Sequence, residues 1–187
     1  MEKNSFSKRL VCDDETLSAL IAVHRRLGQK IVLLSGTFDL FHIGHARYLE
    51  KAKVLGDLLI VGVDSDEKVS SRKGPSRPVV PQEERLEILC HTRHVDFVFL
   101  KELSDPPKKL IKLVRPDVLV LSATTKSHSQ SEIDSLKEFC KEVVILDAQA
   151  TASTTARIRL VLIDIVDKAK AKLTEVIAWL DQIGGKV

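Results

Sequence analysis

Two histidines lie close together in the segment "LSGTFDLFHIGH" (34–45), which begins in a short apolar run. His42 and His45 are three residues apart and flank Gly44, and a turn by itself needs no imidazole. An imidazole donates hydrogen bonds in its neutral and its charged form. If a helix begins here, its free N–H groups add donors for an anion. The spacing therefore predicts a site for a phosphate whose charge grows during a reaction.

The residues before the histidines form the turn that must position them. We expect Gly36 to let the backbone turn and approach a ligand closely. We expect Asp39 to accept hydrogen bonds from local N–H groups and brace the turn. Thr37 and Phe38 lie between these two residues and belong to the same candidate site.

A second group of candidate residues is basic. Arg72, Lys73 and Arg77 lie in a stretch rich in Ser, Gly and Pro, within residues 64–80. Phosphoryl transfer depends mainly on positioning and on neutralising charge. We therefore predict a flexible cationic loop that closes on a triphosphate and excludes water. The alternative is an ordinary solvated surface loop.

Three hydroxyl residues, Ser153, Thr154 and Thr155, precede a long helical pattern. A helix cap would account for one of them. Three together can cap the helix and also donate hydroxyls to a phosphate.

Five apolar runs of strand length alternate with helical stretches and must position these residues. The apolar runs cover residues 30–35, 57–63, 96–100, 117–121 and 142–147. The helical stretches cover residues 14–27, 47–55, 81–93, 106–114 and 131–140. Solidly apolar strands are typical of a parallel sheet covered on both faces. The pattern predicts an α/β, Rossmann-like, doubly wound five-stranded parallel sheet with an N-terminal helix and a long C-terminal helix.

In such a sheet, ligands bind beyond the carboxyl ends of the strands. The loops of chemical interest all follow a strand, so we expect them to converge on one cleft. These loops cover residues 35–45, 64–80, 122–128 and 148–155.

The bulk composition is typical of one cytoplasmic globular domain. The 187 residues are predicted to form a single domain, with a core at about 28–160 and a helical extension at 156–184. A net charge of +3 is too mild to indicate nucleic-acid binding. Three distant cysteines without a CxxC spacing favour reduced thiols in a cytoplasm. The sequence contains no run of 18 apolar residues, so it predicts no membrane span.

The C-terminal extension carries an apolar stripe at helical period. The stripe consists of Ile158, Leu162, Ile165, Ala169, Leu173, Val176, Leu180 and Ile183. One interpretation is docking onto the chain's own domain. We favour packing against a second copy, because the helix would run beyond a compact sheet, and we therefore predict a homodimer.

The motifs resemble those of a known family. "GTFDLFHIGH" resembles the HxGH signature of nucleotidyltransferases of the cytidylyltransferase-like group. "RKGPSRPVVPQEERLEIL" is similar to the KGxxRPxxPxxxR segment of heptose 1-phosphate adenylyltransferase domains, and "ASTTARI" resembles a late (I/C)STT motif. The resemblance implies a Rossmann-like enzyme that joins a nucleoside triphosphate to a phosphorylated substrate and releases pyrophosphate.

The resemblance also implies roles for individual residues. Catalytic roles fall on His42, His45 and Lys73. Nucleotide contacts fall on Gly36, Thr37, Phe38, Asp39, Gly44, Arg85, Ser153, Thr154 and Thr155. Substrate contacts fall on Asp64, Arg72, Arg77 and Thr124. ATP is the expected co-substrate with Mg²⁺ bridging its phosphates, a small phosphorylated sugar is the expected acceptor, and no metal site on the protein is expected.

The chain departs from the family pattern at two places. After the fourth predicted strand it reads "VLSATTKSHS", with Thr124 where relatives have the aspartate of a GGD or GDD motif. Ala148 stands where cytidylyltransferases carry the arginine of RTxGIST, which favours ATP over CTP. Other interpretations stay open: a cytidylyltransferase for glycerol 3-phosphate or a phospho-alcohol, an FMN adenylyltransferase, or a catalytically altered regulatory nucleotide binder. No GxGxxG follows the first apolar run, which disfavours a dehydrogenase.

Overall fold

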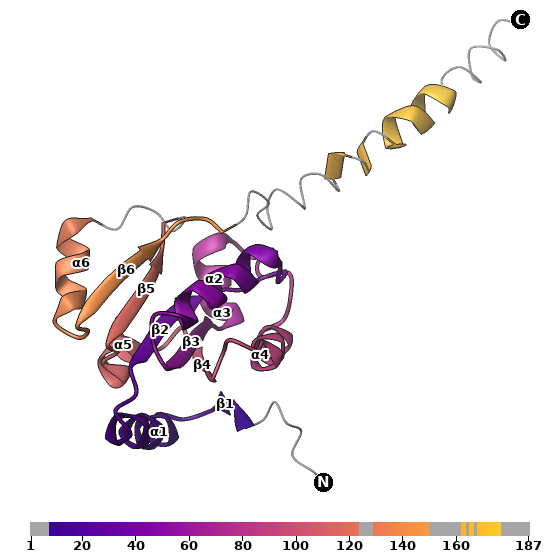
Figure 1. Cartoon of the computed structure of the whole chain (residues 1–187). Coiled ribbons are helices and arrows are strands. Elements are labelled where there is room, and N and C mark those ends of the chain that lie inside the picture. The colour runs from indigo at the N-terminus through magenta and orange to yellow at the C-terminus, as the bar shows by residue number, and fades with distance from the viewer. Residues whose placement is uncertain (1–7, 124–128, 150–161, 164, 167, 177–187) are drawn as a thin grey trace, which may run out of the picture. The chain divides into compact units, whose positions relative to one another are not determined.

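A computed structural model describes residues 8–123, 129–149, 162–163, 165–166 and 168–176, and the structural statements below concern these residues. The contacts divide the chain into two compact units, Met1–Thr151 and Ala152–Val187, which we describe separately. The first unit holds the sheet (Figure 1).

Six parallel strands form the sheet, in the order β1-β4-β3-β2-β5-β6. Their bounds are β1 (Leu10–Val11), β2 (Ile31–Gly36), β3 (Leu58–Asp64), β4 (Phe97–Lys101), β5 (Val118–Ser122) and β6 (Glu142–Leu146). The α/β parallel-sheet prediction is confirmed, with one strand more than the five expected. The additional strand β1 pairs Leu10 with Val98 and Val11 with Phe99, and two residues are too few to show a period in the sequence.

The N-terminal segment is also held by Arg9, which precedes β1. Its Nη1 group donates to the carbonyl oxygens of Cys90, Thr92 and Val95, each at 3.1 Å. This guanidinium therefore ties β1 to the end of the fourth helix and the loop that follows it.

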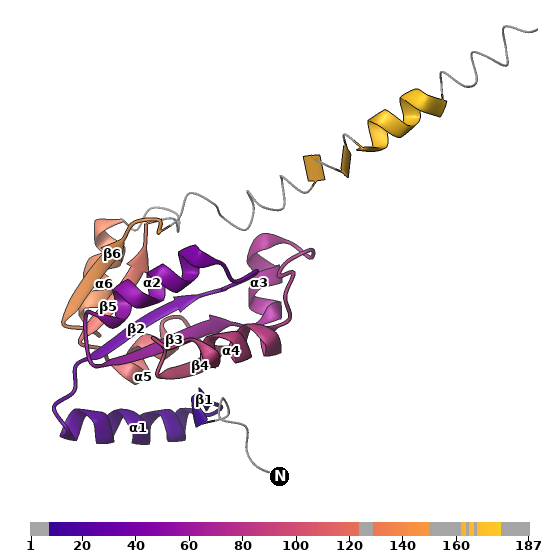
Figure 2. The same cartoon turned by 45° about the vertical axis from the view of Figure 1, so that its right-hand side comes forward.

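Helices cover both faces of the sheet (Figure 2). Their bounds are α1 (Asp14–Arg26), α2 (Ile43–Lys53), α3 (Asp66–Lys73), α4 (Gln82–His91), α5 (Lys109–Val114) and α6 (Gln130–Lys137). Alternate residues of β2 enter two cores: Leu34 shares one with Leu49 of α2, and Leu33 shares the other with Leu17 of α1. The first core also contains α4, and the second contains α5 and α6. All seven residues of β3 are buried, which explains its solidly apolar sequence.

Helix α3 corrects the expectation of a flexible loop over residues 64–80. Ser65 caps this helix by accepting a hydrogen bond from the Lys68 N–H at 3.3 Å, and Gly74 ends it with a φ of 94°. Only Val69 of the helix is buried, so the sequence shows no apolar stripe. Arg72 and Lys73 consequently lie in the last turn of a helix and not in a mobile loop.

The second unit is helical at residues 162–163, 165–166 and 168–176. Its apolar side chains are exposed, with 55% of Leu162 and 61% of Leu173 accessible to solvent. Among the described residues, no helix combines the length and apolar character that crossing a bilayer requires.

Candidate active site

The turn after β2 contains two residues with left-handed backbone conformations. The φ angles of Phe38 and Leu40 are 55° and 46°, values that cost free energy in residues other than glycine. The positive φ angles fall on Phe38 and Leu40 and not on Gly36, where we expected the chain to turn, and close approach of a ligand to Gly36 stays a prediction. A Cβ atom at Gly36 would lie 2.9 Å from Cε2 of Phe38, so glycine is needed here to let that ring pack closely.

His42 is the N-cap of α2, which begins four residues before the predicted start. Its Nδ1 atom accepts a hydrogen bond from the Gly44 N–H at 3.0 Å, as a Ser or Asp cap would. The neutral ring therefore carries its proton on Nε2. The rings of His42 and His45 stack with centroids 4.0 Å apart and planes inclined by 22°. The two imidazoles thus form one unit at the amino end of α2.

His45 is held in an apolar surrounding. The rings of Phe38 and Phe41 lie 5.3 Å and 5.6 Å from its ring centroid. Its Nδ1 atom is buried and has no hydrogen-bond partner among the described residues. Burial, and then the charge of His42, lower the pKa of His45 from 6.5 to about 4. The ring is therefore neutral at pH 7.

The end of α3 brings two cations to this turn. Lys73 Nζ lies 3.4 Å and Arg72 Nη2 lies 3.5 Å from Oγ1 of Thr37. Burial, followed by the charge of Arg72, lowers the pKa of Lys73. The charge of Lys73 in turn contributes to lowering the pKa of His45. Within the described part of the chain, no carboxylate lies within 4.0 Å of Lys73 Nζ, so its charge is available to an anion.

Asp39 braces the turn through partners about forty residues away, and hydrogen bonds from local N–H groups stay a prediction. It accepts hydrogen bonds from the Val79 N–H at 3.1 Å and the Val80 N–H at 3.0 Å, and it pairs with Arg77 at 3.0 Å. Burial raises the pKa of Asp39, but the hydrogen bonds from Val80, Val79 and Arg77 outweigh it and lower the pKa below 3.8. This carboxylate fastens residues 77–80 to the turn.

Arg85 is fully buried and holds three segments together. Its Nε donates to the Val80 carbonyl at 3.0 Å and its Nη1 to the Thr37 carbonyl at 2.6 Å. Its Nη2 donates to the Asp64 carbonyl at 2.8 Å and to Asp66 Oδ1 at 2.7 Å. In this structure its donors are thus directed at protein oxygens, and a phosphate contact by Arg85 stays a prediction.

Asp64 lies between two cations at the end of β3. Its carboxylate contacts Arg72 at 2.7 Å and Lys101 at 3.1 Å, and it is almost fully buried. Lys101, the last residue of β4, was not among the residues predicted to form the site. The available signal was a lysine directly after the apolar run 96–100, at the carboxyl end of a predicted strand.

The structure brings residues 36–45 together with residues 64–85 at the carboxyl edge of the sheet, as predicted. Four predicted site residues lie outside the described residues: Thr124, Ser153, Thr154 and Thr155. The Ala123 N–H donates to the Leu146 carbonyl at 2.9 Å, which extends the pairing of β5 and β6 up to the start of the third predicted loop.

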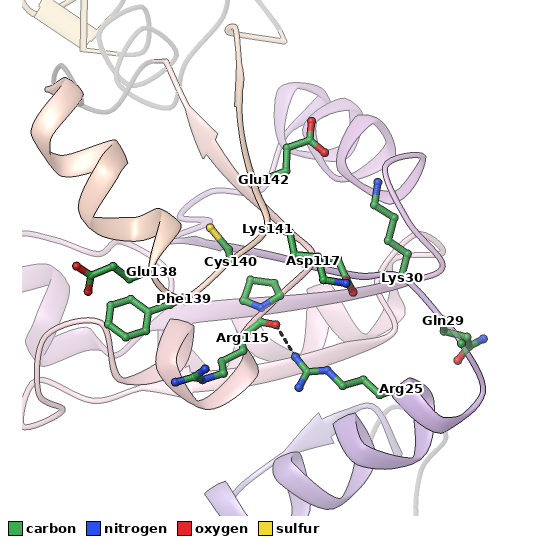
Figure 3. A pocket seen from close by; sticks show the side chains of 12 residues that line it. Arg25, Gln29, Lys30, Arg115, Asp117, Glu138, Phe139, Cys140, Lys141 and Glu142 are labelled. Carbon is green, nitrogen blue, oxygen red and sulfur yellow. Dashed lines mark hydrogen bonds and ion pairs between the residues drawn. The ribbon is translucent and has the colours of Figure 1, made fainter.

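A hollow of about 1130 Å³ lies at the opposite, amino edge of the sheet (Figure 3). Arg25 and Arg115 line it, and the Arg25 guanidinium donates to the carbonyls of Val114 and Arg115 at the end of α5. Lys141 pairs there with Asp117 at 2.6 Å. Arg25 thus satisfies a helix end and Lys141 a carboxylate, and the hollow contains neither histidine of the turn.

A smaller hollow of about 430 Å³ lies at the carboxyl edge. Ser35 of β2, Lys101 of β4 and Ser122 of β5 line it, so it neighbours the histidine turn in the sheet.

The pair His91 and His94 forms no metal site among the described residues. His91 lies 3.7 Å from Glu87, and His94 lies 3.7 Å from Glu50. Each ring thus lies beside a glutamate, at the end of α4 and in the residues that follow it.

Comparison with known proteins agrees with this geometry. A family model described as cytidylyltransferase-like matches residues 33–178. Proteins named bifunctional protein HldE are 44% identical over 134 residues in a Nitratiruptor species and 37% identical over 148 residues in Syntrophotalea carbinolica. These matches cover 72% and 79% of this chain but only 28% and 30% of the relatives, so the chain spans less than a third of their length.

Two solved structures share the fold. A lipopolysaccharide core biosynthesis protein from Thermoplasma volcanium matches with a TM-score of 0.53 and 29% identity, over 65% of this chain and 97% of that one. A pantoate-beta-alanine ligase from Francisella tularensis matches with a TM-score of 0.52 and 16% identity, over 76% and 67% of the two chains. The family model covers well over half of the sequence and includes the histidine turn. This chain therefore belongs to the cytidylyltransferase-like family.

Proposed function

We propose that this protein is an adenylyltransferase that transfers AMP from ATP to a phosphorylated sugar or a similar small phosphate ester. One observation carries the proposal: two stacked imidazoles at the amino end of α2, within electrostatic reach of Lys73. Helix N–H groups, imidazole donors and an ammonium with no carboxylate within 4.0 Å among the described residues together suit a phosphate that gains negative charge. Heptose 1-phosphate adenylyltransferase is the activity that the motifs suggest most directly, and the relatives named HldE support it.

The proposed reaction is a single in-line displacement. An oxygen of the acceptor's phosphate forms a bond to the α-phosphorus of ATP, the bond from that phosphorus to the bridging oxygen breaks, and pyrophosphate leaves. His42, His45 and Lys73 stabilise the charge on the α-phosphate and the leaving group. No covalent enzyme intermediate is needed, because orientation and electrostatics lower the barrier.

Mg²⁺ enters this proposal as the counterion of ATP. The described residues offer no group of three His, Cys, Asp or Glu side chains that could hold a metal ion. Mg²⁺ commonly keeps several waters and binds substrate phosphates with few protein ligands. The ion would neutralise phosphate charge, while the residues of the turn orient the α-phosphate.

A screen for pyrophosphate release tests the proposal. ATP and CTP are assayed in parallel against sugar 1-phosphates, including heptose 1-phosphate, and against glycerol 3-phosphate. We expect release with ATP and a sugar phosphate. Release with CTP alone would identify a cytidylyltransferase, and ATP binding without release on any acceptor would favour a regulatory nucleotide binder. The alternative of a regulatory binder is motivated by Thr124, which replaces the family's aspartate.

We also propose that the protein is a cytoplasmic homodimer. The three cysteines are free thiols, which suits a reducing compartment that supplies ATP. In the described parts of the second unit, Leu162, Ile165, Leu173 and Val176 are about half exposed and follow a coiled-coil spacing. A second copy offers the same stripe and would cover these side chains by knobs-into-holes packing.

A further inference from the structure

A buried carboxylate lies between two cations beside the histidine turn. Asp64 ends β3 and is almost fully buried. Its Oδ2 atom contacts Nη2 of Arg72 at 2.7 Å, and its Oδ1 atom contacts Nζ of Lys101 at 3.1 Å. Each carboxylate oxygen therefore has a cation of its own, so the influence of Asp64 on a ligand passes through these two partners.

The sheet places Lys101 beside this carboxylate. Asp64 and Lys101 are register partners in the parallel strands β3 and β4, and the Ser65 N–H donates to the Lys101 carbonyl at 2.9 Å. A Cβ atom at Gly62 would lie 2.8 Å from Cδ of Lys101, so glycine leaves room there for the stem of the lysine. The lysine thus packs alongside β3, and its ammonium group reaches Asp64.

The same carboxylate fixes the direction of Arg72. This arginine lies in the last turn of α3, and 53% of its side chain is exposed. Its Nη2 atom contacts Asp64 and also lies 3.5 Å from Oγ1 of Thr37, the atom that Lys73 Nζ approaches to 3.4 Å. Two cations therefore converge on one point of the turn. A long side chain that would otherwise sample many rotamers is held there by a buried partner.

Arg85 fixes the backbone at both ends of this contact. Its guanidinium donates to the Asp64 carbonyl at 2.8 Å and to the Thr37 carbonyl at 2.6 Å. Because a guanidinium is planar and rigid, it sets the position of Asp64 relative to Thr37. Arg72, which bridges the side chains of these two residues, is thereby aimed at the turn.

Lys101 decides the net charge of the cluster. Asp64 alone would neutralise Arg72, whereas two cations around one carboxylate leave one positive charge. The polyphosphate of a nucleotide is strongly anionic, so this remaining charge favours its binding at the turn. Lys101 can therefore affect a ligand that it does not touch.

We infer that Asp64 and Lys101 are positioning residues of the proposed reaction. Asp64 aims Arg72 at the phosphates bound at the turn, and Lys101 offsets the charge of Asp64 so that Arg72 remains effective as a cation. The inference rests on the proposed function in one respect, because it takes the anion at the turn to be the triphosphate of the nucleotide.

Calorimetric titration of ATP and of inorganic tripolyphosphate, each with Mg²⁺, tests the role of Lys101 without requiring turnover. Lys101→Met should weaken binding of both probes by at least about five-fold, the scale of one lost unit charge near a protein surface after screening by salt. Lys101→Gln keeps a donor for Asp64 but not the charge, so it should weaken binding to a similar extent. Circular dichroism confirms that each variant is folded.

A double variant separates charge from structure. Asp64→Asn/Lys101→Met removes one negative and one positive charge, and the amide oxygen can still accept a hydrogen bond from Arg72. Binding of both probes should return to within about two-fold of the unmodified protein, because one net positive charge is restored. A double variant that binds as weakly as Lys101→Met would overturn the inference, since the pair would then only support the fold.

Lys53→Met is the matched control. Lys53 pairs with Asp96, and 26% of its side chain is exposed, against 23% for Lys101. It lies at the end of α2 away from the turn, so its loss should leave both affinities unchanged. Equal weakening in Lys53→Met would show an effect of total charge and would overturn the inference.

Two further results would also overturn the inference: unchanged affinities in Lys101→Met, or no binding of either probe to the unmodified protein. Pyrophosphate release is assayed separately on the unmodified protein. Absence of release, together with tripolyphosphate binding that falls in Lys101→Met and returns in the double variant, would reject the proposed reaction and keep the positioning roles.

Discussion

At the scale of single residues, His45 combines burial with an unpartnered ring nitrogen. Its Nδ1 atom has no partner among the described residues, although buried polar atoms usually have one. A ligand oxygen is the natural hydrogen-bond partner for this nitrogen. This residue therefore gives the sharpest tests of the proposed site.

Replacing His45 with alanine should lower kcat by about 100-fold or more, which is typical for the loss of one donor to a developing negative charge. The measurement is pyrophosphate release at saturating ATP and acceptor. His91→Ala is the control, because that histidine lies beside Glu87 at the end of α4 and should leave kcat unchanged. Full activity in His45→Ala would refute the role assigned to this ring.

His45 should also make the stability of the protein depend on pH. Its pKa is about 4 in the folded protein and about 6.5 in the unfolded chain. The unfolded chain binds more protons between these values, so the free energy of unfolding decreases as the pH falls through that window. Between pH 7.5 and pH 5, we expect the free energy of unfolding of the unmodified protein to fall by about 2 kcal/mol more than that of His45→Asn. Urea denaturation at the two pH values measures the difference, and equal losses in both proteins would contradict the assignment.

At the scale of elements, α3 carries the two cations of the turn on a short helix with one buried residue. Its position depends on the Ser65 cap and on Arg85, which holds both Asp64 and Asp66. The helix is therefore weakly stabilised by packing and strongly by polar contacts.

Removing the cap of α3 should impair function as well as stability. Ser65→Ala is expected to cost about 1 kcal/mol, the usual value for an N-cap, and to raise the KM for ATP because Lys73 shifts with the helix. Ser129→Ala removes the cap of α6, which Ser129 and Glu132 form together. It should cost a similar amount and leave the KM unchanged. An unchanged KM in Ser65→Ala would show that α3 does not position the nucleotide.

At the scale of the whole molecule, the C-terminal stripe should set the oligomeric state. Leu173→Glu places a charge on the stripe and should convert the proposed dimer into a monomer, as measured by light scattering after size exclusion. Thr174→Glu introduces the same charge one residue away, off the stripe, and should remain dimeric. A monomeric unmodified protein, or a dimer in Leu173→Glu, would show that this helix does not mediate self-association.

The sequence predicts most of the fold because the apolar runs of β2 to β6 are long enough to be identified as strands of a covered sheet. It also predicts that His42 and His45 lie together at the amino end of a helix, because the motif follows an apolar run and precedes a helical stretch. It misses α3, whose single buried residue produces no period, and β1, which has only two residues. The inward direction of Arg85 could not be predicted, because burial of a guanidinium depends on carbonyls from distant segments.

The two-residue strand β1 has a consequence for the protein's behaviour in concentrated solution. Leu10 and Val11 occupy the outer side of β4, whose backbone groups would otherwise be open to a strand from another molecule. Detaching this short segment would expose a hydrophobic template for edge-to-edge pairing. A short strand and one arginine thus cover the edge of β4.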